Sequence, residues 1–272
     1  MHPGGRLDHM QQLISPQGTP HTDPQSLAAL AAVYAYPDQV NHGRPWLRAN
    51  MVTGLDGGAR LEGLSEGLSG DADKRIFGVL RALADVVLVG AETVRAEGYR
   101  PGRARAEFAA ARAAAGQAPA PAIAIVSRGL RLDLTAPLFT EPLVRTVVVT
   151  TEDSPAEARA AVAEVADLVV AGVGSVDLPV ALAALAERGW TRQLTEGGPR
   201  LLGQLSSAGL LDELCLSLAP LLTGGDAPRI LQDAEMADVQ RMRLVSLIEQ
   251  KGFLFTRYLR YPAPDDSAPT TR

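Results

Sequence analysis

The segment that decides the fold is Thr195-Glu196-Gly197-Gly198-Pro199-Arg200-Leu201-Leu202-Gly203. It follows a short strand pattern at 193–195, and its proline suits the first turn of a helix, where no amide donor is needed. The two glycines let a ligand approach the backbone closely. A helix that starts here presents free N–H groups, which can bind a phosphate. The segment therefore predicts a strand–turn–helix unit, either as a plain turn or as an anion site.

Strand and helix patterns alternate before this segment and give way to strands after it. Short apolar runs such as Asp85–Gly90 are typical of buried parallel strands. The strand patterns lie at 46–52, 85–90, 122–126, 146–150 and 168–170, the helix patterns at 71–83, 155–165 and 178–187, and the final strand patterns at 211–218, 243–248 and 253–259. This order predicts a mostly parallel sheet with antiparallel strands near the C-terminus.

The main domain is expected to span residues 45–260. Residues 1–25 are rich in Pro, Gly, Gln and His without periodic apolar positions, so we expect a disordered tail there, and a second one at 261–272. Residues 26–44 predict a short helix, capped by Ser26, and a linker. We expect Asp71 to cap the helix at 71–83. Residues 101–120, rich in Ala and Arg, fit an exposed helix or a mobile insertion.

Composition excludes several classes of function. The chain has 272 residues and a net charge of −5, which is unfavourable for general binding of nucleic acid or of a membrane surface. No apolar run reaches membrane-spanning length and the N-terminus lacks a secretory pattern, so we expect a cytoplasmic protein. Cys215 is the single cysteine, and all four histidines precede the main domain. We therefore expect no disulfide and no metal site.

Two further strand ends carry residues suited to a ligand. Val89-Gly90-Ala91-Glu92-Thr93 ends a buried strand with a glycine and a hydroxyl, and Val126-Ser127-Arg128-Gly129 ends the next with a hydroxyl and a guanidinium. Arginine binds phosphate oxygens in a bidentate fork, which suits the 2′-phosphate of a dinucleotide. Ligands bind at the carboxyl ends of parallel strands. The carboxylates at such ends, Asp56 and Glu196, are the candidate acid–base groups.

These motifs together resemble the reductase domain of the riboflavin-pathway deaminase/reductase family. The resemblance covers about residues 45 to 259. Its parts, in family order, are Leu55-Asp56-Gly57, Leu80-Arg81-Ala82 with Asp85, Val89-Gly90 with Thr93-Val94, Ser127-Arg128, Glu196-Gly197-Gly198-Pro199 with Leu201, Leu210-Leu211-Asp212-Glu213-Leu214, Ala219-Pro220 and Gly224-Gly225.

The resemblance implies a dihydrofolate-reductase-like α/β fold, a three-layer sandwich, with NADPH as hydride donor. It also implies a homodimer and a small-molecule pyrimidine or pteridine substrate. The expected cofactor contacts, with Arg128 added from its chemistry, are Val52, Thr53, Gly90, Thr93, Ser127, Arg128, Gly197, Gly198, Pro199, Arg200, Leu201 and Leu202. The expected substrate contacts are Ser65, Arg81 and Glu196. Glu196 is the favoured catalytic carboxylate, and Asp56 is either catalytic or a structural turn residue.

The sequence departs from the family pattern at several points. The deaminase pattern of His-x-Glu with Pro-Cys-x-x-Cys does not occur, so we expect a reductase alone. Gly54 and Asn50 stand where the family often has Ser and Lys. Glu97-Gly98-Tyr99-Arg100-Pro101 replaces a substrate-holding stretch, Asp-Asp-Pro-x-Leu-Thr-x-Arg.

Three functions remain open from the sequence. The first is reduction of 5-amino-6-(5-phosphoribosylamino)uracil to its ribitylamino form in riboflavin biosynthesis. The second is another NADPH-dependent reduction, of dihydrofolate or a related pteridine. The third is nucleotide binding without turnover. A phosphate-binding Arg81 favours the first over the second, because folates carry no ribose phosphate.

Overall fold

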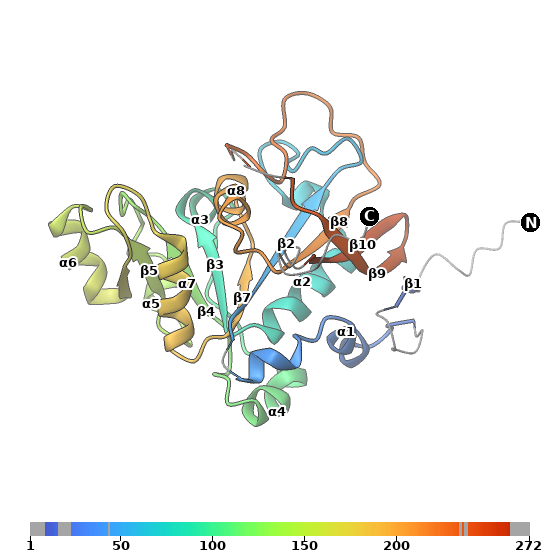
Figure 1. Ribbon diagram of the computed structural model, residues 1–272, viewed down its shortest axis with the longest axis horizontal. Helices are drawn as coiled ribbons and strands as arrows, with labels where there is room; N and C mark the ends of the chain where they lie inside the picture. Colours follow the sequence, from blue (N-terminus) through green and yellow to red (C-terminus); the bar gives the residue numbers. More distant parts are fainter. Residues whose placement is uncertain (1–8, 16–22, 43, 234–235, 237–238, 262–272) are drawn as a thin grey trace, which may run out of the picture.

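The strands within the described residues belong to one ten-stranded sheet (Figure 1). The computed structural model describes residues 9–15, 23–42, 44–233, 236 and 239–261. The strands are β1 (Gln11–Ile14), β2 (Trp46–Thr53), β3 (Val86–Gly90), β4 (Ala122–Val126), β5 (Val147–Thr150), β6 (Asp167–Val170), β7 (Arg192–Thr195), β8 (Glu213–Leu218), β9 (Met242–Gln250) and β10 (Phe253–Arg260). Their order across the sheet is β1-β9-β10-β8-β2-β7-β3-β4-β5-β6.

The pairing of the strands matches the expected fold class. From β8 through β2, β7, β3, β4 and β5 to β6, every neighbouring pair is parallel. The pairs β8–β10, β10–β9 and β9–β1 are antiparallel. The predicted parallel sheet with an antiparallel C-terminal edge is therefore confirmed.

Helices cover both faces of the sheet and make three layers (Figure 1). They are α1 (Leu27–Val33), α2 (Asp71–Leu83), α3 (Ala91–Ala96), α4 (Ala106–Ala114), α5 (Pro137–Thr140), α6 (Ala156–Val165), α7 (Leu178–Glu187) and α8 (Pro199–Ser207), with 3-10 turns at Asp38–His42 and Glu66–Leu68. Alternate residues of β3 face opposite ways: Val87 and Val89 pack with residues of α2, whereas Val86 and Leu88 pack with residues of α7 and α8. Burial on both faces explains why the central strands are continuously apolar.

The helix ends differ in part from expectation. The Ser26 side chain accepts a hydrogen bond from the N–H of Ala29 at 3.0 Å, as a cap should. Asp71, in contrast, is the first residue of α2, and Gly70 is the cap without a side-chain bond. The expected cap at Asp71 is therefore wrong. Its carboxylate and that of Asp73 lie in the first turn, where the helix dipole favours negative charge.

Part of the expected N-terminal tail is ordered. Gln11–Ile14 forms β1 on the outer edge of β9, and Met10 beside it is fully buried in the core. A four-residue strand has too few positions for a periodic pattern, so the compositional bias of residues 1–25 concealed it. Residues 1–8 and 16–22 of that expected tail, and residues 262–272, lie outside the described residues.

The alanine- and arginine-rich stretch contains the helix α4, which is anchored rather than mobile. Phe108 is buried in the core. Arg112, only 3% exposed, donates from Nη1 to the carbonyl oxygens of Ala82 and Ala84 at 2.7 and 2.8 Å. These bonds attach α4 to the C-terminal end of α2. None of the described helices is both long and apolar enough to cross a bilayer.

The strand β8 lies inside the sheet, between β2 and β10. Alternate residues of β8, Glu213, Cys215 and Ser217, are buried, and the residues between them are half-buried. Cys215 on this strand is buried, and burial raises the pKa of its thiol well above the usual range. The thiol is therefore a small core group with little thiolate at neutral pH.

A buried charge cluster fixes β8 against β2 and β10. Both Arg48 and Arg257 reach the fully buried Glu213, with Nε to Oε1 distances of 2.8 and 2.7 Å. Burial alone would raise the pKa of Glu213, but the two guanidinium groups lower it to about 2. Removing the carboxylate would leave two arginines in the interior without their counter-charge, which is strongly destabilising.

Glu213→Gln is therefore expected to lower the free energy of unfolding by about 3–5 kcal/mol in chemical denaturation at neutral pH. Because the folded pKa lies below the usual value of about 4.5, this stabilisation is complete above that pH and is lost as the pH falls toward about 2. The variant should lose that part of the pH dependence. Glu187→Gln, at an exposed site at the end of α7, is the control. Equal stability of the two variants would contradict the role given to the cluster.

Candidate active site

Two cavities meet at the carboxyl ends of the central parallel strands. The larger has a volume of about 880 Å³ and the smaller about 360 Å³, and Thr93 lines both. In Figure 1, α3 and α8 lie near this edge of the sheet. The N–H of Gly198 donates to the Thr93 hydroxyl at 3.0 Å, and the N–H of Gly90 donates to the carbonyl of Gly197 at 3.1 Å. These two bonds join the turn after β3 to the turn after β7.

The larger cavity gathers eight of the twelve expected cofactor residues. They come from the ends of three strands and the start of α8: Gly90, Thr93, Ser127, Arg128, Gly198, Pro199, Arg200 and Leu201. The described lining contains five arginines, Arg60, Arg95, Arg128, Arg131 and Arg200, against one carboxylate, Glu92. The cavity is therefore cationic in an acidic protein, and it suits an anionic ligand.

Glycine is required at position 198 by a neighbouring side chain. A Cβ there would lie 2.6 Å from the Thr93 hydroxyl oxygen. At Gly90, a Cβ would meet its nearest atoms at 4.0 Å, which is an ordinary contact. The close approach between the two turns thus depends on Gly198 rather than on Gly90.

The other four expected cofactor residues do not line the larger cavity. Val52 lines the smaller one. Thr53 is buried, and its hydroxyl bonds the carbonyl oxygens of Gly54 and Gly58 in the turn after β2. Gly197, in the turn before α8, and Leu202, in the first turns of α8, are both buried.

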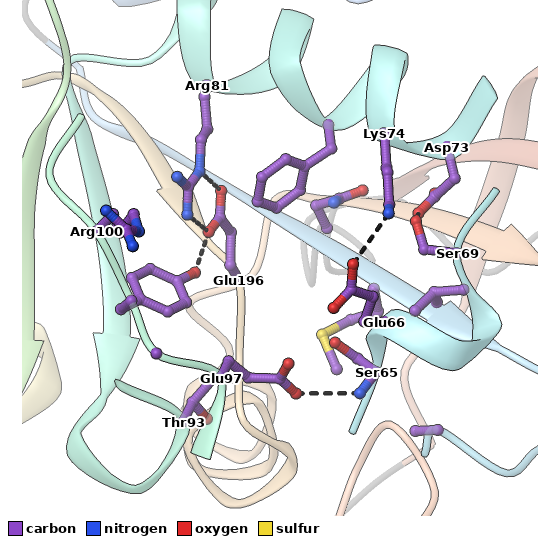
Figure 2. A pocket seen from close by; sticks show the side chains of 17 residues that line it. Ser65, Glu66, Ser69, Asp73, Lys74, Arg81, Thr93, Glu97, Arg100 and Glu196 are labelled. Carbon is purple, nitrogen blue, oxygen red and sulfur yellow. Dashed lines mark hydrogen bonds and ion pairs between the residues drawn. The ribbon is translucent and has the colours of Figure 1, made fainter. Parts of the chain in front are cut away.

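The smaller cavity lies between α2 and the turns that follow β2 and β7. Figure 2 shows Arg81, Glu196 and Arg100 on one side of it, and Lys74, Glu66, Ser69 and Asp73 on the other. All three expected substrate residues, Ser65, Arg81 and Glu196, line this cavity. Charged groups on both sides and an apolar floor suit a polar heterocycle.

The central interaction of this cavity is a bidentate ion pair. Nε and Nη2 of Arg81 donate to the two oxygens of Glu196 at 2.7 and 2.6 Å, and the hydroxyl of Tyr99 donates to the same carboxylate. Burial would lower the pKa of Arg81, but Glu196 raises it above its usual range. Burial, followed by Glu196, raises the pKa of Tyr99 well above 10. Tyr99 therefore stays a phenol, and the two oxygens of Glu196 accept the hydrogen bonds of Arg81 and Tyr99.

The opposite side of the cavity is fixed by bonds between its own groups. Lys74 and Glu66 form an exposed ion pair at 3.0 Å. The buried carboxylate of Asp73 accepts from the hydroxyls of Ser69 and Ser217 at 2.5 and 2.6 Å. The backbone N–H of Ser65 donates to Glu97 at 3.1 Å, so this loop is tied to the end of α3.

Asp56, the other expected carboxylate, lies outside both cavities. Its Oδ2 accepts from the N–H groups of Thr223 and Gly224 at 2.8 and 2.7 Å, and Oδ1 accepts from the N–H of Gly58 at 3.3 Å. The N–H of Gly224 is the main cause, ahead of the Thr223 hydroxyl, of a pKa lowered to about 2. The geometry is that of a turn residue that joins the loops after β2 and β8.

Several residues of the smaller cavity were not predicted from the sequence, among them Asp73, Phe77 and Tyr99. Asp73 and Phe77 precede Arg81 by eight and four positions on α2 and line the cavity with it. The i, i+4, i+8 spacing of Asp73, Phe77 and Arg81 places the three side chains on one face of α2, and this spacing is the signal in the sequence that could have identified them. Tyr99 lies in the stretch that departs from the family pattern, so no motif pointed to it.

Comparisons with known proteins identify the relatives of the chain. A family model described as the RibD C-terminal domain matches residues 45–251. Two relatives carry the name 2,5-diamino-6-ribosylamino-4(3H)-pyrimidinone 5′-phosphate reductase. The protein of Archaeoglobus fulgidus is 31% identical over 215 residues, which are 78% of this chain and 97% of the relative. The protein of Methanothermobacter thermautotrophicus is 32% identical over 212 residues, 74% of this chain and 91% of the relative.

Solved structures share the architecture. A pyrimidine reductase-like protein of Corynebacterium diphtheriae has a TM-score of 0.75 at 26% identity, covering 86% of this chain and 99% of that one. A riboflavin biosynthesis reductase of Saccharomyces cerevisiae has a TM-score of 0.59 at 16% identity, covering 80% of this chain and 91% of that one. The second likeness shows the fold alone.

Asp56→Asn is expected to lower the melting temperature, because an amide is a weaker acceptor for the three backbone N–H groups. With a folded pKa of about 2, the stabilisation by Asp56 is present above its usual pKa and is lost as the pH falls toward 2. Thermal melts of Asp56→Asn and of Asp226→Asn, a change in the loop after β8, measure the effect. A wild-type melting temperature in Asp56→Asn with reduced turnover would instead assign Asp56 to catalysis.

Proposed function

The chain belongs to the RibD C-terminal domain family, and on that premise we propose that it is an NADPH-dependent reductase of a 6-ribosylaminopyrimidine 5′-phosphate. The two named relatives act, by their names, on the 2,5-diamino-pyrimidinone form. The uracil form expected from the sequence differs from it at ring position 2, where an oxygen replaces the amino group. Both forms are candidate substrates.

The observation that carries the proposal is the meeting of two chemically different cavities at one residue. Thr93 lines both the cationic cavity and the cavity that contains Arg81 and Glu196. A reductase must bring a nicotinamide and its substrate into contact, whereas a simple nucleotide-binding protein needs only the first cavity. This arrangement favours turnover over binding alone.

The residues of the cationic cavity fit a phosphorylated dinucleotide. The N-terminus of α8 offers backbone N–H groups for a pyrophosphate, and Gly198 and Pro199 at this end of the helix line the cavity. Arg128 is exposed at the end of β4, where its guanidinium could bind a 2′-phosphate. When bound, NADPH supplies a hydride to the reacting carbon of the substrate.

The residues of the smaller cavity fit a pyrimidine. Glu196 presents carboxylate oxygens that can accept from ring N–H or amino groups, and Arg81 fixes their direction through the bidentate pair. Phe77 and Tyr99 line the same cavity and offer aromatic surface for a flat ring. In this proposal Glu196 binds and orients the substrate rather than donating a proton.

The homodimer implied by the resemblance remains part of the proposal. Because β8 lies inside the sheet, the candidate contact surface between two subunits is the loop that follows this strand. Leu222 in that loop is 78% exposed.

Arg128→Ala is expected to weaken NADPH binding by about tenfold or more with little effect on NADH, because a charge-assisted contact to the 2′-phosphate is lost. The matched control is Arg131→Ala, which removes an equal charge from the same cavity. Fluorescence titrations with both nucleotides measure the effect. An equal loss for NADPH and NADH would contradict a specific contact at Arg128.

Glu196→Gln is expected to lower kcat/KM for the phosphoribosylaminopyrimidine by about 10–100-fold, because one charged acceptor is replaced by an amide. NADPH affinity should stay unchanged, since Glu196 does not line the cationic cavity. Steady-state assays with both pyrimidine forms and with dihydrofolate test the proposal directly. Glu66→Gln, in the same cavity, is the control. Full activity of Glu196→Gln would contradict the role given to Glu196, and turnover of dihydrofolate alone would refute the proposed substrate.

A further inference from the structure

We propose that a recess beside the substrate cavity binds the phosphate of the substrate through Arg100, Arg103 and Arg105. This recess, called the arginine recess below, has a volume of about 270 Å³. The inference rests on the proposed function, because it assigns the 5′-phosphate of that substrate to a place. It names arginines that the sequence analysis left without a role.

The arginine recess continues the substrate cavity. Phe77, Arg81 and Arg100 line both, so a ligand in one can extend into the other. Figure 2 shows Arg100 on the same side of the substrate cavity as the Arg81–Glu196 pair. A ring held at Glu196 would therefore have its ribose phosphate within reach of the recess.

The charge of the arginine recess is entirely positive. Four arginines line it, and its described lining contains no carboxylate. Within the described part of the chain, no hydrogen bond or ion pair engages the side chains of Arg100, Arg103 or Arg105. Other arginines of the protein are paired, as Arg48 and Arg257 are with Glu213. Like charges in one recess repel one another unless an anion lies between them, and a phosphate with its several oxygens suits this role.

The fold makes room for one of these arginines. A Cβ at Gly78, in the middle of α2, would lie 2.3, 2.6 and 2.8 Å from Nη2, Cζ and Nη1 of Arg105. The guanidinium therefore rests against the helix backbone at Gly78, and a Cβ at this position would displace it. Glycine inside a helix is less stable than alanine, so the room for Arg105 lowers the stability of α2.

A second glycine fixes the segment that carries Arg103. At Gly102, a Cβ would lie 2.2 Å from the carbonyl oxygen of Pro121, so the chain passes close against the residue before β4. The segment 101–105 is thus held as a wall of the recess rather than as a loose loop. This wall begins where the sequence departs from the family pattern, at Glu97–Pro101.

Arg81 is not free to serve as the main phosphate ligand. Its Nε and Nη2 already bind both oxygens of Glu196. It adds positive charge to the recess, but its planar fork is directed at the carboxylate. A phosphate must therefore take its bidentate contacts from the other arginines.

The test uses the full chain and D-ribose 5-phosphate as the probe, titrated by calorimetry, with D-ribose and inorganic phosphate alongside. D-Ribose 5-phosphate should bind, inorganic phosphate should compete with it, and D-ribose should not bind. Arg103→Gln and Arg105→Gln should each weaken binding by about tenfold. Gly78→Ala keeps every charge but displaces the Arg105 guanidinium, and it should weaken binding similarly. Arg243→Gln, an exposed arginine on β9 that lines none of the three cavities, is the control.

The same variants are then assayed for reduction of the phosphoribosylaminopyrimidine, with melting temperatures to verify folding. KM should rise about tenfold while kcat changes little. Unchanged KM in Arg105→Gln and Gly78→Ala, in an enzyme that does reduce the pyrimidine, overturns the recess and leaves the proposed function intact. Wild-type binding of D-ribose 5-phosphate that depends on these arginines, in a protein that reduces neither pyrimidine, supports the recess and refutes the proposed function. Equal binding of the probe by every variant overturns the recess.

Discussion

The parallel pairing of β7 between β2 and β3 is the constraint on which both cavities depend. Thr195 at the end of β7 is in register with Ala49 on one side and Leu88 on the other. The next residue, Glu196, hence emerges between the two neighbouring strands, and its N–H donates to the carbonyl of Leu88 at 3.2 Å. The glycine turn that follows meets Thr93 of α3, the helix that follows β3. One strand therefore supplies the carboxylate of one cavity and the helix N-terminus of the other.

Much of this architecture could be predicted from the sequence, because periodicity and turn chemistry are local. The strand at 122–126 and the helices at 71–83 and 178–187 have the predicted bounds. Several cavity-lining residues could be predicted because parallel strands place their carboxyl ends at one edge of the sheet. The strand β1 could not be predicted in this way, since four residues carry no readable period and its stability comes from pairing with β9.

Interactions between residues that are far apart in the chain could not be predicted from the sequence. Arg81 and Glu196 are 115 positions apart, and each looked like an independent substrate contact until their bidentate bond became visible. Asp56 looked like a second catalytic group, whereas its partners at 223 and 224 belong to a loop 167 positions away. The roles of Gly78 and Gly102 likewise depend on what faces them, which a motif does not contain. Each of these pairings is created by the sheet rather than by a neighbour in the chain.

The measurement that tests the central claim most directly follows the transferred hydrogen. The protein is incubated with the phosphoribosylaminopyrimidine and with NADPH in which both hydrogens at nicotinamide C4 are deuterium, and the product is analysed by mass spectrometry and NMR. The account predicts one deuterium in the product, on the first carbon of a ribityl chain, while the pyrimidine ring stays unlabelled. An unlabelled product, or a label on the ring, would contradict it.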